Sequence, residues 1–233
     1  MKIFSDERLV ALGYVSGTVS KHTGSGRDKA NVERLMQKLG IEPARILGLN
    51  QVHGDEIIKI LNAEDLDNYR KQTTHNADGW LLGLSGVGAL ILTADCVPLY
   101  IWDDDGKAVS LTHCGWRGVV AQLPKKAAKM VGQNAPKAKN ICAFIGPHIS
   151  ACCFEVKEDV ANKFNKTSII NKDGKLFVDL ANEITLQLTA EGVKKENIKT
   201  GCNCQCTACN KEDFFSYRRD KTKDALISFV YKI

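Results

Sequence analysis

The sequence lacks any long apolar run: nowhere in its 233 residues is there a stretch approaching the roughly 20 apolar residues of a membrane span. This excludes a membrane-spanning segment. The opening residues MKIFSDERLV place charged Asp6, Glu7 and Arg8 where a secretory signal would be apolar. We therefore expect no export. Histidine is also scarce, with five in the whole chain.

Internal repeats, low-complexity tracts and Pro/Ser-rich linkers are absent too, which favours a single domain over residues 1–233. A chain of this length buries enough surface to fold without disulfides. The nine cysteines are an odd number in a chain without an export signal, so we predict a reduced, cytoplasmic protein. The net charge of +5 comes from dispersed lysines, which weakly favours anionic small molecules and argues against a nucleic-acid partner.

Helix signals are few. Asp28 can cap a helix that ends before Gly40, and helical spacing is also present over 156–165 and 181–190. Strand-like runs are more numerous, and Asp-Gly pairs at 105–106 and 173–174 predict hairpin turns. The predicted strands span residues 57–60, 88–93, 99–102, 108–111, 141–145, 176–180 and 227–231. Hairpins mixed with irregularly spaced helices predict an α+β fold.

The segment LTADCVPLYIWDDDGKAVSLTHCGWRG, residues 92–118, carries the chemistry. A two-residue turn at Asp105-Gly106 would pair Pro98 with His113, and Cys96 would then be the diagonal neighbour of His113 on the same face. A four-residue loop would place Cys96 and His113 directly opposite each other, and a three-residue loop would separate them onto opposite faces. A thiolate and an imidazole at one end of a hairpin are typical metal ligands.

His53, in the segment Asn-Gln-Val-His-Gly, is the candidate third ligand. A His2Cys set with a vacant fourth position is typical of catalytic zinc, although the same set describes a blue-copper centre. No methionine lies nearby for the axial position of copper, so we predict zinc at His53, Cys96 and His113, with copper as the alternative.

Three arginines are candidate phosphate ligands. Arg117 precedes a predicted helix that continues through Val131 with a kink at Pro124, and a helix start with glycines and an arginine can hold phosphate. Arg218 and Arg219 are a pair near a strand end, which is a second candidate. Asp95 is expected to point away from Cys96 and to support the ligands indirectly.

Five motifs in order resemble the YfiH family, which includes FAMIN-like laccase-domain proteins. The motifs are QVHG, TADCVP, HxGWRG, GPxIxxxxFEV over 146–156 and CTACxxxxFFSYRRD over 206–220. The resemblance implies two mixed β-sheets with helices packed outside them, in a four-layer αββα arrangement. It implies a zinc-dependent purine nucleoside phosphorylase that cleaves adenosine, inosine and methylthioadenosine with inorganic phosphate, and also deaminates adenosine. The family's zinc ligands fall on His53, Cys96 and His113.

The sequence departs from the family pattern in two places. The early segment reads HTGSGRDKANV over 22–32 where a Ser-Leu-Asn-Leu-like motif is usual, and Lys223-Asp224-Ala225 replace Thr-Gly-Arg. We leave open the substrate contacts that the family makes from these two places.

Three alternatives accompany this interpretation. Older labels imply a copper-dependent polyphenol oxidase or laccase, or a peptidoglycan-editing hydrolase. Known multicopper oxidases use roughly ten histidines, and this chain has five, so we expect any oxidase activity to be weak. The non-enzymatic alternative is an interaction module in which Cys202, Cys204, Cys206 and Cys209 bind a second zinc.

Overall fold

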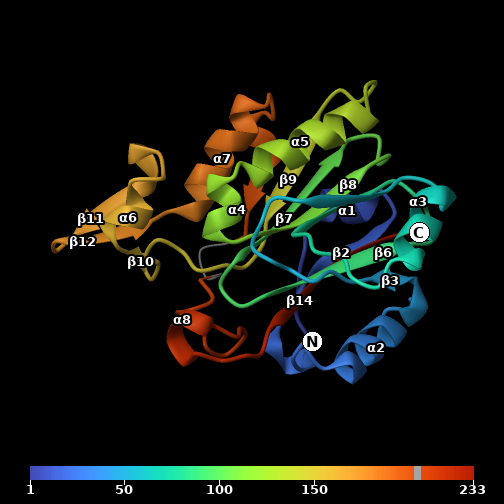
Figure 1. Cartoon of the computed structure of the whole chain (residues 1–233), viewed down its shortest axis with the longest axis horizontal. Helices are drawn as coiled ribbons and strands as arrows, with labels where there is room; N and C mark the ends of the chain where they lie inside the picture. Colours follow the sequence, from blue (N-terminus) through green and yellow to red (C-terminus); the bar gives the residue numbers. More distant parts are fainter. Residues whose placement is uncertain (202–205) are drawn as a thin grey trace.

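The computed structural model describes residues 1–201 and 206–233, which form two large mixed sheets and one small antiparallel sheet (Figure 1). The five-stranded sheet has the order β1 (Ile3–Phe4), β2 (Tyr14–Val19), β14 (Leu226–Lys232), β6 (Gly88–Thr93), β3 (Ile46–Leu47). The six-stranded sheet has the order β13 (Ile198–Thr200), β9 (Ile141–Ile145), β7 (Val97–Asp103), β8 (Val109–Cys114), β5 (Gly79–Leu82), β4 (Ile57–Ile60). The small sheet comprises β10 (Glu155–Val156), β12 (Lys175–Val178) and β11 (Ile169–Lys172).

The described part of the chain forms eight α-helices. They are α1 (Glu7–Ala11), α2 (Lys29–Lys38), α3 (Ala63–Lys71), α4 (Trp116–Val120), α5 (Leu123–Asn134), α6 (Glu158–Ala161), α7 (Leu180–Ala190) and α8 (Tyr217–Asp220). Of these, α4, α5 and α7 cover the outer face of the six-stranded sheet, and α2 covers that of the five-stranded sheet. Figure 1 shows α5 and α7 above the six-stranded sheet, and α2 below the five-stranded one. No helix among the described residues is long and apolar enough to cross a membrane.

Alternation along the strands divides the apolar side chains among three cores. In β7, Leu99 and Ile101 face α5 and α7, while Tyr100 and Trp102 face the other large sheet. A third core lies between α2 and the outer face of the five-stranded sheet, where Phe229 packs. The predicted α+β fold with two mixed sheets and outer helices is confirmed, and the small third sheet was not predicted.

The predicted hairpin register is confirmed. Pro98 pairs with His113, and the strands are joined by a loop centred on Asp105-Gly106. The loop is longer than the expected two residues, since the pairing of β7 with β8 ends at Trp102 and Val109. The buried carboxylate of Asp103 closes it by accepting hydrogen bonds from three main-chain N–H groups, those of residues 105, 107 and 108.

Two helix predictions were partly wrong. Over 156–165 only α6 forms, because Val156 pairs with Leu176 in the small sheet and this tertiary pairing outweighs the local helical spacing. The helix expected from Arg117 through residue 131 is two helices, separated at Gln122, which has a left-handed φ of 64°. Pro124 therefore lies in the first turn of α5, where proline is favoured, and does not kink a continuous helix.

Ile91 tests the core between the two sheets. Ile91 is 0% exposed, whereas Ile170 in the small sheet is 44% exposed. We expect Ile91→Ala to lower the free energy of unfolding by about 2 to 5 kcal/mol, because it leaves a cavity. The matched change Ile170→Ala should cost roughly 0.5 kcal/mol or less. Urea unfolding measures both, and equal losses would contradict this description of the core.

Candidate active site

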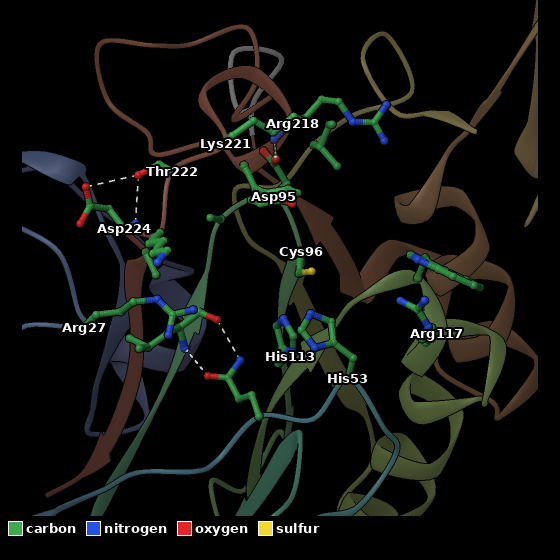
Figure 2. Close-up of a pocket in the computed structure, with 18 of the residues that line it drawn as sticks. Arg27, His53, Asp95, Cys96, His113, Arg117, Arg218, Lys221, Thr222 and Asp224 are labelled. Atoms are coloured by element: carbon green, nitrogen blue, oxygen red, sulfur yellow. Dashed lines mark hydrogen bonds between the residues drawn. The ribbon is translucent and has the colours of Figure 1, made fainter. Parts of the chain in front are cut away.

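Three side chains from separate segments meet at one end of the β7–β8 hairpin (Figure 2). His53 lies in the loop between β3 and β4, Cys96 directly precedes β7, and His113 belongs to β8. Their nitrogen and sulfur atoms all lie within 4.8 Å of one another. The structure thus brings together the three residues selected from the sequence, and their role as metal ligands stays a prediction.

A residue that the sequence analysis missed organises two of the three. Asp78, whose side chain is 0% exposed, accepts hydrogen bonds from the main-chain N–H groups of Val52, His53 and Gly54. Its other contact is with His113, whose Nδ1 lies 2.8 Å from the carboxylate. Nδ1 therefore donates to Asp78, and Nε2 of His113 is the nitrogen that a metal would bind in place of a proton. The only feature of the sequence that marked Asp78 was its position directly before the apolar run that forms strand β5.

Gln51 holds the same loop from the other side. Its side-chain amide donates to the carbonyl of Leu92 at 2.8 Å and accepts from the N–H of Leu92 at 2.7 Å. The glutamine of QVHG thereby ties the His53 loop to β6 at Leu92, directly before the TADC motif of residues 93–96. His53 itself has a left-handed φ of 61°, a conformation held by these contacts.

Gly115 leaves room beside the three side chains. A Cβ atom at this position would lie 3.2 Å from Sγ of Cys96 and 3.1 Å from Cδ2 of His53. A larger residue would require both side chains to shift by a few tenths of an ångström. The glycine of HxGWRG is therefore favoured by this close approach and not by backbone conformation, since its φ is −69°.

The charges of the cluster favour a thiolate beside an imidazolium. Burial alone would raise the pKa of Cys96, but His113 and His53 lower it to about 6. Burial alone would likewise lower the pKa of His113, but the Cys96 thiolate and Asp78 raise it to about 9. The carboxyl of Asp78 has a lowered pKa, because the hydrogen bonds from His113 and Gly54 outweigh its burial. A cation placed among these groups would replace the proton on His113.

Asp95 connects this turn to the C-terminal region. It has a φ of 92°, and its carboxylate accepts from Thr207 Oγ1 at 2.6 Å, Ser216 Oγ at 3.1 Å and the Arg218 N–H at 2.6 Å. Its carbonyl accepts from the N–H of Ile149. The Asp95 side chain points away from Cys96, in agreement with the indirect role expected of it.

The cluster opens into a cavity of about 790 Å³. Five basic side chains line it, against the two acidic residues Asp95 and Asp224: they are Arg27, Arg117, Arg218, Lys221 and Lys223. Figure 2 shows Arg117 and Arg27 on opposite sides of the three central side chains. A concave site with excess positive charge is suited to an anionic substrate.

Comparisons with known proteins identify the family of this chain. A model of the family described as multi-copper polyphenol oxidoreductase laccase matches residues 14–231. The chain belongs to this family. Its relatives include the purine nucleoside phosphorylase YfiH of Escherichia coli, 30% identical over 94% of this chain and 88% of that protein. The YfiH resemblance is thus confirmed.

Other members add a second enzyme name and a solved structure. A purine nucleoside phosphorylase of Clostridium acetobutylicum is 36% identical over 79% of this chain and 75% of its own. The adenosine deaminase RL5 from an unknown prokaryotic organism is 29% identical over 79% of this chain and 74% of its own. The crystal structure of YlmD from Geobacillus stearothermophilus has a TM-score of 0.83 and 27% identity, covering 94% of this chain and 92% of that one.

The two segments in which this laccase-family chain departs from the family pattern both line the cavity. Arg27 comes from the early segment, and Lys223 and Asp224 come from the late one. The sequence analysis did not select Arg27, although it stands in a segment that was singled out. Its position in the wall follows from the packing of Gly26 against Leu92 and Ile227, where a Cβ atom would clash.

The three candidate phosphate ligands occupy different surroundings. Arg117 lines the cavity and lies over the ring of Trp116, with 4.4 Å between the guanidinium carbon and the ring centre. Arg218 also lines the cavity, and its guanidinium donates to the carbonyl of Glu155 at 2.8 Å. Arg219 instead donates to the carbonyls of Thr207, Ala208 and Phe214. The structure therefore brings Arg117 and Arg218 to the cavity, but not Arg219.

Asp78→Ala tests the support of the ligands. We expect zinc affinity to fall about 10- to 100-fold, because His113 loses the acceptor that orients its ring and the His53 loop loses three hydrogen bonds. Competition with a chromophoric chelator measures this affinity. The control is Asp105→Asn in the exposed hairpin turn, which should bind zinc like the wild type. Unchanged affinity in Asp78→Ala, with a native circular dichroism spectrum, would show that Asp78 does not support the metal site.

Proposed function

We propose that this cavity is the active site of a zinc-dependent purine nucleoside enzyme, which cleaves nucleosides with inorganic phosphate and deaminates adenosine. The observation that carries the proposal is the His53, Cys96 and His113 cluster opening into a cavity lined by cationic side chains. The names of relatives that cover most of the chain support the same chemistry.

The donor set suits zinc. Zinc binds imidazole nitrogen at about 2.0 to 2.1 Å and thiolate sulfur at about 2.3 Å in tetrahedral geometry. Three donor atoms within 4.8 Å of one another need little movement to reach that arrangement. When bound, zinc would supply a Lewis acid that stabilises developing negative charge. The ring of His113 would be held by Asp78, and the cavity side of the cluster would be left for substrate.

The placement of the five histidines favours zinc over the copper of the family's description. His22 is largely exposed beside Asp213, and His75 stacks on Tyr69 with 3.7 Å between the ring centres. His148 donates to the carbonyl of Gly146. Only His53 and His113 share a cluster among the described residues, so no three-copper cluster can be built from histidine there.

The walls of the cavity suit a nucleoside and phosphate. The guanidinium of Arg117 has no hydrogen bond or ion pair within the described part of the chain and lies over the ring of Trp116, so it is available to bind a phosphate oxygen pair. Arg218 reaches the cavity from the 206–220 segment, at the top of Figure 2. Trp116, Phe154 and Tyr217 also line the cavity and offer aromatic surface to a purine.

Neither proposed reaction needs a reactant other than the nucleoside and phosphate or water. In phosphorolysis a phosphate oxygen forms a bond to C1′ of the ribose as the C1′–N9 bond breaks, and the departing purine takes up a proton. The arginines orient the phosphate and offset its charge. In deamination, water adds at C6 of adenine and ammonia leaves, so no phosphate is needed. We expect this chemistry to take place in the cytoplasm, with free purine nucleosides and without nucleic acid.

Metal analysis tests the ligand assignment. We expect His53→Ala, Cys96→Ala and His113→Ala each to lose about one zinc per chain relative to the wild type, because three protein ligands are the minimum of an open zinc site. The control is Cys142→Ala, which removes a buried thiol of β9 far from the cluster in the sequence. Full zinc retention in all three variants would place the metal elsewhere.

Product analysis tests the reaction. Inosine should yield hypoxanthine and ribose 1-phosphate only when phosphate is present, whereas adenosine should yield inosine without phosphate. Arg117→Ala should lose about 2 to 4 kcal/mol of transition-state stabilisation in phosphorolysis, on the scale of one charge-stabilising donor, while deamination is retained. The control is Arg70→Ala on the exposed side of α3. Cys96→Ala should lose both reactions.

The outcomes separate the assignments. Equal loss of both reactions in Arg117→Ala would make this arginine structural. Nucleoside cleavage that proceeds without phosphate would replace a phosphorylase with a hydrolase. No turnover of any nucleoside by the zinc-loaded wild type would refute the proposed function.

A further inference from the structure

Four cysteine sulfurs meet outside the proposed active site. Cys152 and Cys153 lie in the turn before β10, and Cys206 and Cys209 lie more than 50 residues later in the chain. All four Sγ atoms are within 4.8 Å of one another. Cys152 Sγ is 3.6 Å from each of the other three, and Cys153 Sγ is 3.3 Å from Cys209 Sγ.

These separations match one ion at the centre of four thiolates. Four sulfurs bound tetrahedrally at about 2.3 Å lie about 3.8 Å apart. A disulfide would require one pair at about 2.05 Å. A four-iron cluster binds each cysteine to a different iron and therefore holds the sulfurs further apart. We infer that Cys152, Cys153, Cys206 and Cys209 bind a second, structural zinc ion.

The surroundings of the sulfurs hold the Cys206–Cys209 turn in place. The main-chain N–H of Ser150 donates to Sγ of Cys206 at 3.4 Å, as is usual around metal-bound thiolates. The turn from Cys206 to Cys209 is closed by hydrogen bonds from the N–H groups of residues 209 and 210 to the carbonyl of Cys206. Arg219, which is paired with Asp220, donates to the carbonyls of Thr207 and Ala208 and fixes the main chain between the two cysteines.

The ligand set differs from the one suggested by the cysteine-rich segment alone. Of Cys202, Cys204, Cys206 and Cys209, the first two lie outside the described residues. The structure supplies the other pair from Cys152 and Cys153. Two cysteine pairs from well-separated segments are typical of structural zinc, and four protein ligands leave no position for a substrate.

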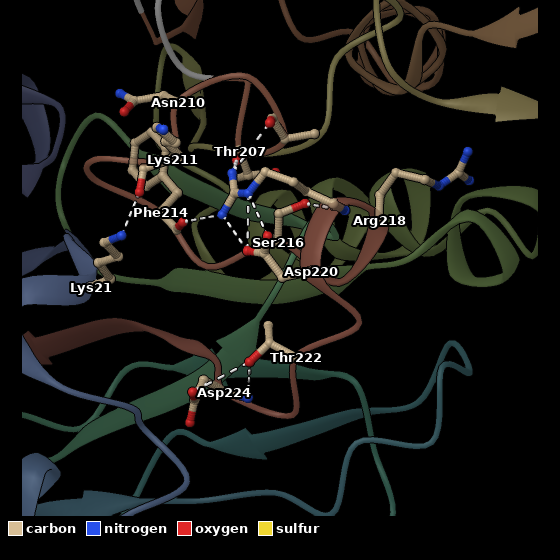
Figure 3. A network of polar contacts seen from close by, with 12 residues as sticks. Lys21, Thr207, Asn210, Lys211, Phe214, Ser216, Arg218, Asp220, Thr222 and Asp224 are labelled. Atoms are coloured by element: carbon tan, nitrogen blue, oxygen red, sulfur yellow. Dashed lines mark hydrogen bonds and ion pairs between the residues drawn. The ribbon is translucent and has the colours of Figure 1, made fainter.

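The position of the proposed second zinc indicates a structural role, which is to cross-link two segments of the chain. It would join the 146–156 segment to the 206–220 segment, which also contact each other through an isolated bridge between His148 and Cys206, a few hydrogen bonds and the packing of Arg218 over Phe154. Both segments contribute walls of the cavity, including Phe154 and Arg218. Figure 3 shows Thr207, Ser216 and Arg218 in the polar network of the later segment. The second zinc would therefore hold two walls of the active site in register without touching the substrate.

The test is zinc content per chain in the purified full-length protein. The double variant Cys152→Ser/Cys209→Ser removes two exposed ligands and should contain one zinc fewer than the wild type, with a lower melting temperature. Cys202→Ser/Cys204→Ser is the matched control and should retain all of the zinc. Cys96→Ala should lose only the other ion, so the two sites are counted separately and failure of one assignment leaves the other standing.

Cobalt substitution gives a second measurement that needs no folded double variant. Cobalt bound to Cys96→Ala should show intense visible bands and sulfur-to-metal charge transfer typical of four thiolates. Zinc retention in Cys152→Ser/Cys209→Ser would overturn the inference. It would also be overturned by zinc loss in the control variant, by a weak cobalt spectrum in Cys96→Ala, or by thiol titration that finds disulfides among these four cysteines.

Discussion

The buried carboxylate of Asp78 is the interaction on which the active site depends. It binds the His53 loop through three main-chain N–H groups and His113 through its ring nitrogen. One anion thus positions two of the three proposed ligands and leaves Nε2 of His113 facing the cluster. The cost of burying this carboxylate is offset because the groups that contact its oxygens are hydrogen-bond donors. Asp78 therefore joins the loop between β3 and β4, which has no regular strand pairing, to strand β8.

A second carboxylate, that of Asp95, positions part of the cavity wall, just as the carboxylate of Asp78 positions two of the proposed ligands. Its bonds to Thr207, Ser216 and Arg218 fasten the C-terminal segment to the turn that carries Cys96. Two of the four clustered cysteines, Cys206 and Cys209, flank Thr207 in the same segment. His53 and Asp95 both have positive φ, and the contacts of Asp78 and Asp95 hold the main chain in these conformations.

Local signals predicted much of the fold. The capped helix starting after Asp28, the strands β4, β6 and β9, and the hairpin centred on Gly106 all form as expected, because each depends on short-range pattern or turn chemistry. Predictions failed where a distant segment decided the outcome. The helix expected at 156–165 gives way to strand pairing with residues 20 positions later, and no local spacing reveals such a partner.

The sequence by itself predicted that Cys96 and His113 lie close together, because the position of a turn defines the register of its two strands and register defines which side chains share a face. It also marked His53 through the motif that contains it. Only the tertiary structure decided that Asp78 joins the two histidines and that Cys152 and Cys153 meet the later cysteines. These contacts join segments with no strand register between them, so they depend on how the sheets and loops pack and not on spacing along the chain.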